Sequence, residues 1–388
     1  MIRPRWLVVG ALGCAQILAW GSSYYLIAVL ARPIDLDTGW GLTWIVGGLS
    51  IGFLVSGLVS PRVGRLIERF GGRPVLAGSA VLLAMGLALL SVAPNVPVYV
   101  LGWCVLGVAM GAGLYDPAFA TLGRIYGEQA RSAITLTTLY GGFASTVCWP
   151  LSAVLVEQVG WRGACLAYAA IALLVILPLY VFGLPRETAQ PAPMAGAAAA
   201  AALSPRMRVA FWLVAVNLTL ASVIMTVVSV HMLTLLQERG VELAVAVALG
   251  ALIGPSQVGA RVLEAMIGRR FHPIWTLVAS NVLAAAGLGL MFGEPSLMAA
   301  GLLLYGSGSG IRSIARGTVP LALFGRAGYP TLMGRLAMPT LLAQAASPSL
   351  GALLLDRAGP DSTLWVLALT AVFAIVTTLP LLAFTRQA

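Results

Sequence analysis

The sequence has few charged residues and no lysine. Only 9% of its 388 residues are charged, whereas 60% are hydrophobic and the mean hydropathy is +0.95. A water-soluble domain has about 25% charged residues. These proportions exclude a soluble globular protein and indicate a chain embedded in a lipid bilayer.

Cysteine is also scarce, and its spacing is not that of a metal or redox site. Cys14, Cys104, Cys148 and Cys165 all lie in apolar runs, where cysteine packs as a small hydrophobic side chain. A catalytic constellation is missing too, since the glycine-rich stretch at 306–310 lacks the lysine and the strand of a phosphate loop. We therefore expect neither an enzyme nor a resident cofactor.

The sequence has long apolar runs and lacks the short strands of alternating polarity that form a membrane barrel. The chain is therefore expected to cross the bilayer as helices. One crossing needs about 20 mainly apolar residues. The sequence predicts an all-α membrane protein with twelve transmembrane helices. They lie near 7–30, 40–60, 75–93, 97–120, 132–156, 161–183, 209–236, 243–264, 274–292, 296–319, 331–354 and 362–384.

The distribution of arginine orients these helices. With the N-terminus in the cytoplasm, the inner loops hold 16 arginines and three acidic residues, and the outer loops hold four arginines and eight acidic residues. This bias fits the positive-inside rule and places both termini in the cytoplasm. It also accounts for the net charge of +10 without a nucleic-acid partner. We expect a multi-pass protein of the bacterial inner membrane.

The two halves of the chain repeat each other. GAGLYDPAFATLGRIYG (111–127) aligns with GSGIRSIARGTVPLALFG (308–325). An Ala- and Pro-rich stretch at 184–208 is typical of a flexible linker. We expect two pseudo-symmetric six-helix bundles, 1–183 and 209–388. Such repeats are typical of secondary transporters, whose substrate site lies at the repeat interface.

Besides Arg162 and Arg335, which lie near helix ends and are counted with the loops, five charged residues fall inside the expected helices: Arg261, Glu264, Arg312, Arg316 and Asp116. Arg312 and Arg316 are one turn apart and share a helix face. An arginine at a helix centre costs about 2.5–3.5 kcal/mol on insertion scales, so it faces a cavity or a partner. Three roles stay open for the pair: binding an anionic substrate, forming a salt-bridge gate with Asp116, or reaching the cytoplasmic surface.

Asp116 is the candidate for proton coupling. A carboxyl group in a poorly hydrated cavity holds its proton more tightly, and a nearby arginine weakens that hold. A cycle that brings the two together and apart would bind and release a proton. The alternative is that Asp116 and Pro117 only mark a helix break.

Further polar residues fall on expected cavity-lining helices. Gln16, Trp20 and Tyr24 follow i, i+4, i+8 spacing and form a stripe that either lines a cavity or packs in the core. Gln257 lies one turn before Arg261, and both are candidates for substrate contact. For Arg261, pairing with a neighbouring charge is the alternative.

The stretch GRLIERFGGRP resembles the cytoplasmic G-x-L-x-D-R-x-G-R-R motif of the major facilitator superfamily, with Glu68 in the Asp position. The resemblance extends over essentially the whole chain. It implies that Gly64 and Gly71 permit a tight turn close to neighbouring helix ends. It also implies that Glu68 caps a helix and pairs with arginine in a cytoplasmic gate that includes Arg69 and Arg73. The alternative is a basic loop that only fixes topology.

Two departures argue against the drug-efflux branch of that superfamily. GWCVLGVAMGAG (102–113) lacks the arginine usual in the fourth helix, and CWPLSAVL (148–155) keeps the proline but not its flanking glycines. A weaker likeness points to monocarboxylate and oxalate/formate porters. It rests on AWGSSYYLIAVLARPI (19–34), GWR (160–162) and Arg261, because those porters commonly hold a carboxylate with a basic residue of the eighth helix.

We therefore expect a secondary transporter that works by alternating access and couples a small organic anion to protons. Arg312 and Arg316 would clamp the anion, and Asp116 would carry the proton. The alternative is efflux of an apolar or cationic drug or metabolite by proton antiport. The expected partners are a small-molecule substrate, protons and the lipid bilayer, and we expect the protein to act as a monomer.

Overall fold

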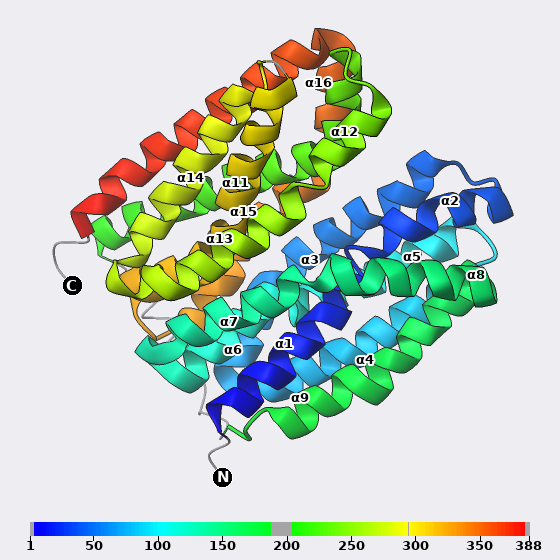
Figure 1. Ribbon diagram of the computed structural model, residues 1–388. Coiled ribbons are helices and arrows are strands. Elements are labelled where there is room, and N and C mark those ends of the chain that lie inside the picture. Colours follow the sequence, from blue (N-terminus) through cyan, green and yellow to red (C-terminus); the bar gives the residue numbers. More distant parts are fainter. Residues whose placement is uncertain (1–3, 188–203, 294, 385–388) are drawn as a thin grey trace. The chain divides into compact units, whose positions relative to one another are not determined.

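A computed structural model describes residues 4–187, 204–293 and 295–384, and every element in these ranges is helical (Figure 1). The chain divides into two compact units. The first comprises Met1–Ala201 with Arg326–Ala345, and the second comprises Ala202–Gly325 with Ala346–Ala388. Most of the expected linker, residues 188–203, lies outside the described residues.

The helices before the linker are α1 Arg5–Gly21, α2 Leu26–Thr38, α3 Leu42–Phe70, α4 Gly72–Ser91, α5 Val96–Gly113, α6 Tyr115–Tyr126, α7 Ala130–Gly142, α8 Ala144–Ile171 and α9 Leu177–Gly183. Those after it are α11 Pro205–Glu238, α12 Leu243–Gly250, α13 Ile253–Ile267, α14 Pro273–Leu290, α15 Pro295–Phe324 and α16 Tyr329–Thr378. Four shorter helical segments complete the described chain: η1 Gly127–Gln129, η2 Ala172–Ile176, η3 Gly268–Arg270 and η4 Leu379–Phe384.

Two of the helices contain a sharp break at glycine. Gly160 in α8 has φ 70° and Gly359 in α16 has φ 79°, a left-handed conformation that glycine adopts at little cost. Each break separates two of the helices expected from sequence. Eight helical stretches in the described residues are long and apolar enough to cross a membrane, and two of them have 88 and 56 residues. Since one crossing takes about 20 residues, these two can cross more than once, and the number of twelve stays a prediction.

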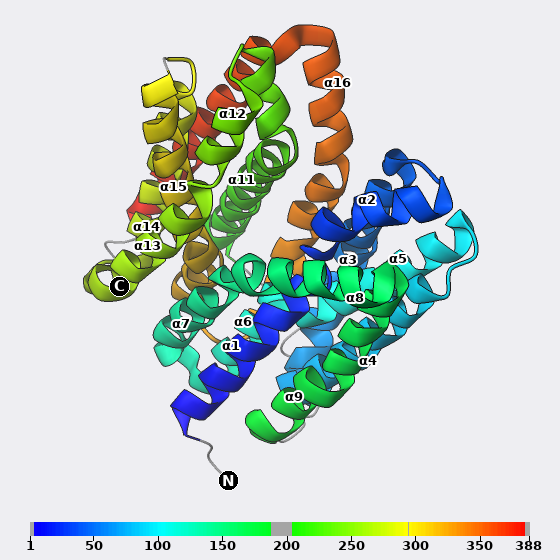
Figure 2. The same ribbon diagram turned by 45° about the vertical axis from the view of Figure 1, so that its right-hand side comes forward.

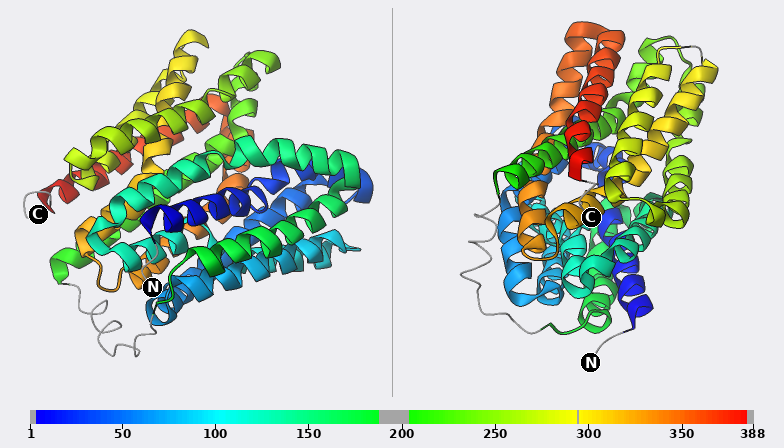
Figure 3. Two further views of the ribbon diagram at one scale, coloured as in Figure 1. Left: turned by 60° about the horizontal axis from the view of Figure 1, so that its bottom comes forward. Right: turned by 90° about the vertical axis from the view of Figure 1, so that its left-hand side faces the viewer.

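Small residues set the helix crossings within each unit. In the second unit α15 lies beside α13 and α14 (Figure 2). A Cβ added at Gly310 would meet the backbone of Gln257 in α13, and one added at Gly308 would meet the backbone of Ser280 in α14. In the first unit α1 lies beside α7, α8 and α9 (Figure 3). Close approach through glycine is how helices gain packing energy in lipid, where a hydrophobic driving force between them is missing.

The first unit contains a similar crossing between α3 and the start of α16. A Cβ at Gly64 would overlap the carbonyl oxygen of Pro330, and one at Gly334 would overlap the backbone of Ser60. Both glycines therefore allow the two backbones to touch. This contact explains why Arg326–Ala345 packs with the first unit.

Charged groups hold the helix ends beside this crossing. The Glu68 carboxylate accepts hydrogen bonds from the backbone N–H groups of Gly328 and Thr331, so it caps the N-terminus of α16, where a negative charge is favourable. Gly71, with φ 86°, makes the one-residue turn between α3 and α4. Arg69 is exposed and lies 4.9 Å from the centroid of the Phe70 ring, and Arg73 is half-buried.

Arg124 at the end of α6 joins this cap to the chain that follows α9. Its Nη1 donates to the backbone carbonyl of Glu68, and its Nε pairs with the carboxylate of Glu187. The side chains of Arg124 and Glu187 are only 12% and 15% exposed. The other oxygen of Glu187 accepts from the Gly72 N–H at 3.2 Å, which caps α4. Two glutamates thus cap two helices, with one arginine between them.

The α3–α16 crossing can be tested with the smallest side chain. We expect Gly64→Ala to lower stability by about 1–3 kcal/mol, because its methyl group must displace the α16 backbone. Gly78→Ala is the matched control, since Gly78 also lies in a helix but faces open space. It should stabilise by up to about 1 kcal/mol through helix propensity. Melting temperatures of the purified protein in detergent decide this, and equal shifts in the two variants would refute the crossing.

The ion pair can be tested by a double-mutant cycle. Arg124→Gln and Glu187→Gln should each lower stability by about 2 kcal/mol or more, because each leaves a largely buried charge without its partner. The double variant should be no worse than the poorer single one. Arg62→Gln, at an exposed position of α3, should leave the melting temperature unchanged. Additive losses in the double variant would show that the two side chains do not interact.

Candidate functional site

Besides the break at Gly160, the described part of the first unit contains three helix breaks that concern the candidate site. Residues 22–25 form a turn between α1 and α2, Leu114 separates α5 from α6, and Phe143 separates α7 from α8. At the first break the hydroxyls of Ser22 and Ser23 bond to the carbonyls of Leu18 and Ala19 at 2.7 and 2.6 Å. The bond from Ser23 satisfies the carbonyl of Ala19, which does not receive the Ser23 N–H, whereas the carbonyl of Leu18 also accepts the Ser22 N–H at 2.9 Å. Discontinuous helices of this kind form substrate and ion sites in transporters.

The three breaks lie next to one another. The rings of Trp20 and Tyr115 are 5.0 Å apart between centroids, which joins the first break to the second. The Tyr115 hydroxyl lies 3.5 Å from the carbonyl oxygen of Thr138 in α7. The sulfur of Cys148 in α8 lies 3.6 Å from the carbonyl oxygen of Ile17 in α1. These contacts bring the three breaks together in one region of the first unit.

Five aromatic rings line this region, and we call them the aromatic cluster: Trp20, Tyr24, Tyr25, Tyr115 and Trp149. Trp20 meets Tyr24 edge-on at 5.5 Å and Tyr25 at 6.3 Å, and Tyr25 meets Trp149 edge-on at 6.1 Å. Edge-to-face pairs are favourable because the positive ring edge meets the negative face. The indole N–H of Trp20 is buried and has no hydrogen-bond partner among the described residues.

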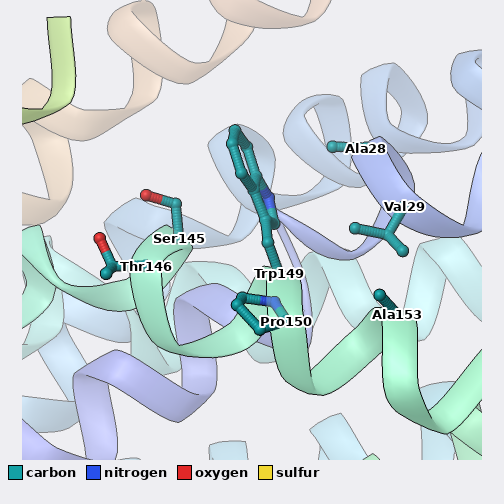
Figure 4. A pocket seen from close by; sticks show the side chains of 7 residues that line it. All are labelled: Ala28, Val29, Ser145, Thr146, Trp149, Pro150 and Ala153. Atoms are coloured by element: carbon teal, nitrogen blue, oxygen red, sulfur yellow. The ribbon is translucent and has the colours of Figure 1, made fainter. Parts of the chain in front are cut away.

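A pocket of about 500 Å³ adjoins the aromatic cluster (Figure 4). It lies between α2 and α8, and its lining residues are Ala28, Val29, Ser145, Thr146, Trp149, Pro150 and Ala153. Figure 4 shows the Trp149 ring between Ser145 and Thr146 on one side and Val29 on the other. The pocket is therefore mainly apolar, with two hydroxyls at one end. Its volume lies within the roughly 300–1,000 Å³ of small-molecule sites.

Asp116 lies in the first turn of α6, directly after the second break and beside Tyr115 of the cluster. It is half-buried, and the N-terminus of a helix favours a negative charge. The buried Tyr329 is close enough to feel that charge, and its ring packs against Gly123 of the same helix. Asp116 thus has partners within the first unit. Its neighbour Tyr115 contacts Trp20, which in turn contacts Tyr24 of the sequence candidates.

Gln16 points into the first unit. It is fully buried, and its Nε2 donates to the carbonyl of Gly113 at 2.7 Å, just before the break at Leu114. Its Oε1 has no partner among the described residues. In this position Gln16 holds α1 against the end of α5 and so supports the helix break. Its role in substrate binding stays a prediction.

In the second unit, Arg312 is 7% exposed and its Nη2 has no hydrogen-bond partner among the described residues. Two turns earlier on α15, Tyr305 is 2% exposed, and its hydroxyl also lacks a partner there. A buried polar group left unpaired costs about 1–3 kcal/mol, and a charged one costs more. Such groups in a native protein call for an explanation, and a bound ligand is one. Arg316, one turn later, is half-buried and has contacts of its own.

The other two sequence candidates of the second unit lie on α13. Arg261 is 6% exposed and donates from Nε to the carbonyl of Gly310 at 3.2 Å. Gln257 lies with its backbone against Gly310. Both residues therefore fix α13 to α15 two residues before Arg312. Glu264, also on α13, accepts a hydrogen bond from Thr276 of α14 at 2.7 Å.

Several residues of these sites escaped sequence reasoning. Tyr25, Tyr115 and Trp149 belong to the aromatic cluster, and their one sequence signal was their position beside Ser-Ser, Asp-Pro and Trp-Pro pairs. Tyr305 directly precedes the glycine-rich stretch at 306–310, and nothing in the sequence marks it as a site residue. Glu187 lies at the edge of the expected linker, and nothing in the sequence relates it to Arg124.

Comparison with known proteins agrees with the fold. The model of the Major Facilitator Superfamily matches residues 12–273. Human monocarboxylate transporter 11 is 30% identical over 236 residues, which are 58% of this chain and 47% of that protein. The chain thus spans about half the length of this curated relative.

Solved structures match nearly the whole chain. The human organic anion transporter MFSD10 has a TM-score of 0.75 at 16% identity, covering 97% of this chain and 100% of that one. The E. coli fucose:proton symporter FucP, in its outward conformation, has a TM-score of 0.75 at 15% identity, covering 95% and 97%. These likenesses show the fold. Together with the match over 12–273, they establish that this chain is a multi-pass membrane protein that belongs to the major facilitator superfamily of transporters.

Proposed function

We propose that this protein moves a small organic anion together with protons by alternating access, in the bacterial inner membrane and with both termini in the cytoplasm. The observation that carries the proposal is the buried Arg312, whose Nη2 has no hydrogen-bond partner among the described residues. Among the described residues, no acidic side chain forms a salt bridge with Arg312. An anionic substrate would supply both the missing charge and the missing acceptors.

The surroundings of Arg312 support an anion clamp. Arg316 lies one turn away on the same helix and adds a second guanidinium, and Arg261 fixes α15 through Gly310. Gln257 offers a further donor on α13. The names of two similar proteins point the same way, since one is a monocarboxylate transporter and the other an organic anion transporter.

Asp116 is the proposed proton carrier. It is half-buried at a helix break, so its surroundings change when the break changes shape during transport. A carboxyl group whose solvation and neighbours alternate binds and releases a proton. We propose Gly64, Glu68, Arg69, Gly71 and Arg73 as the cytoplasmic gate, because Glu68 caps α16 and Gly64 touches its backbone. A monomer contains all these parts.

One observation favours a second candidate, the efflux of an apolar or cationic compound by proton antiport. The aromatic cluster, whose Tyr115 directly precedes Asp116, adjoins a mainly apolar pocket. Aromatic faces attract cations, and Asp116 would then be the counter-charge. The substrate-binding roles of Gln16 and Tyr24 fit either candidate.

The anion clamp predicts the behaviour of Arg312→Gln. Carboxylates should raise the melting temperature of the wild-type protein, because a ligand of the folded state stabilises it. The variant should bind them about 10- to 100-fold more weakly, after losing a charged hydrogen bond worth about 1.5–3 kcal/mol. Arg357→Gln, at an exposed position, is the control. A library of carboxylates, phosphates and cationic drugs supplies the ligands. If only cationic or neutral amphiphiles stabilise the protein, and Arg312→Gln responds equally, efflux takes the place of anion transport.

The proton role predicts the behaviour of Asp116→Asn in proteoliposomes. Uptake of the anion by the wild type should accelerate under an inward proton gradient. The variant should still exchange anion across the membrane, but the gradient should no longer accelerate it, because the amide cannot carry the proton. Glu157→Gln, an exposed acid of α8, should behave as the wild type. An undiminished response to the gradient in Asp116→Asn would exclude this residue as the carrier.

A further inference from the structure

We infer that Tyr329 is a positioning residue for Asp116 and that it couples the proton on this carboxyl group to the cytoplasmic gate. The Tyr329 hydroxyl stabilises the charged carboxylate while the start of α16 is docked on α6, so a proton on Asp116 weakens the docking. The inference deepens the proposed function and rests on it for the role of Asp116 as the proton carrier.

One face of α6 receives the Tyr329 ring. Asp116, Ala120 and Gly123 follow i, i+4, i+7 spacing and therefore share that face. A Cβ added at Gly123 would overlap ring atoms of Tyr329, so glycine is what lets the ring lie on the helix. Ala120, between the other two, has a side chain of one methyl group and is 1% exposed. The charge of Asp116 acts on the Tyr329 hydroxyl group.

The same tyrosine belongs to the gate. Tyr329 is the first residue of α16 and is fully buried. Glu68 accepts hydrogen bonds from backbone N–H groups on both sides of it, and Gly64 lies against the carbonyl oxygen of Pro330. The cap, the helix crossing and the tyrosine ring thus hold one turn of α16, and a movement of this turn changes all three.

The helix α16 carries movements of the second unit to this turn. Residues Arg326–Ala345 pack with the first unit, and from Ala346 onward the chain belongs to the second. The chain stays helical from Tyr329 to the break at Gly359. Alternating access moves the two halves of a transporter against each other, so it acts on the start of α16. When this turn leaves α6, Tyr329 leaves Asp116.

Hydrogen bonding sets the direction of the coupling. A phenol O–H is a donor, and a donor beside a carboxylate favours the charged form. Linkage between two binding events is reciprocal. If docking of Tyr329 favours the charged carboxylate, protonation of Asp116 weakens the docking by the same factor. The gate is therefore held while Asp116 is charged and loosened once it is protonated.

Other charged groups around α6 lie away from Asp116. Arg124, toward the opposite end of α6, pairs with Glu187. The hydroxyl of Tyr115 lies 3.5 Å from the carbonyl oxygen of Thr138. Among the elements packed against α6, α5 has no charged residue. Those on α3, α4, η1 and α7 lie toward the α3–α4 and α6–α7 turns, and they are Arg62, Arg65, Glu68, Arg69, Arg73, Glu128 and Arg131.

A double-mutant cycle tests the inference without a substrate. Melting temperatures of the full-length protein in detergent are measured between about pH 8 and about pH 4, a range in which carboxyl groups titrate. Tyr329→Phe keeps the ring and removes the hydroxyl. It should lower the melting temperature at the alkaline end and progressively less as the pH falls, because the carboxylate becomes protonated. In the Asp116→Asn background its effect should be small and the same at every pH.

Tyr99→Phe is the matched control. Tyr99 is also fully buried in the first unit, but its hydroxyl donates to the neutral carbonyl of Ile45 at 2.8 Å. Its loss should therefore lower the melting temperature equally at every pH. If the effect of Tyr329→Phe is also independent of pH, or persists unchanged beside Asp116→Asn, the hydroxyl does not act on Asp116 and the inference is overturned.

Transport in proteoliposomes separates the inference from the proposed function. Tyr329→Phe should still exchange the anion, but the acceleration by an inward proton gradient should fall by up to about tenfold, the factor that a hydrogen bond to a charged group supplies. If Asp116→Asn abolishes the acceleration and Tyr329→Phe retains it in full, the proton carrier stands and the inference falls. If the cycle shows the coupling but no anion moves with protons, the inferred contact stands and the proposed function falls.

Discussion

The structure depends on one constraint, that lipid offers no hydrogen bonds to the backbone. Every N–H and C=O group within the bilayer must find a partner in the protein, so the chain is helical and stays helical until something else satisfies the freed groups. The turn at 22–25 meets this demand with serine hydroxyls. The carbonyl of Gly113, next to the break at Leu114, meets it with the amide of Gln16. At these two breaks side chains bond to backbone carbonyl groups beside the break.

The same constraint explains the residues around the breaks. Backbone that leaves the helix needs space and polar partners, and both distinguish this region from the uniformly apolar core. The aromatic cluster fills the space without demanding hydrogen bonds from most of its surface, and its rings contact one another edge-on. A region that is irregular, partly polar and incompletely filled is a natural place for a ligand. It is also where a change of shape costs least.

Buried charged side chains have different partners in the two units. In the first unit Glu68 and Glu187 cap helices, and Arg124 pairs with Glu187 and donates to the carbonyl of Glu68. Arg312 of the second unit is buried without such a partner at Nη2. A structural arginine would be expected to resemble Arg124, which is matched on both sides. The contrast between a satisfied arginine and an unsatisfied one is what makes Arg312 a functional candidate.

The sequence by itself determined the membrane class, the helical fold, the family motif and the list of intramembrane charges. Each follows from composition or from neighbours in the chain. The helix breaks at Gly160 and Gly359, which the structure revealed, also have a local cause, since their left-handed conformation favours glycine.

Only the tertiary structure decided which face of each helix points inward. Gln16 turned into the first unit, Tyr25 and Trp149 joined Tyr24, and Glu187 met Arg124 across 63 positions. In a soluble protein the polar pattern of a helix reveals its buried face. In lipid the outer face of a helix is as apolar as the core, so the pattern of polar residues does not reveal which face is buried. Helix rotation is then set by packing between residues far apart in the sequence.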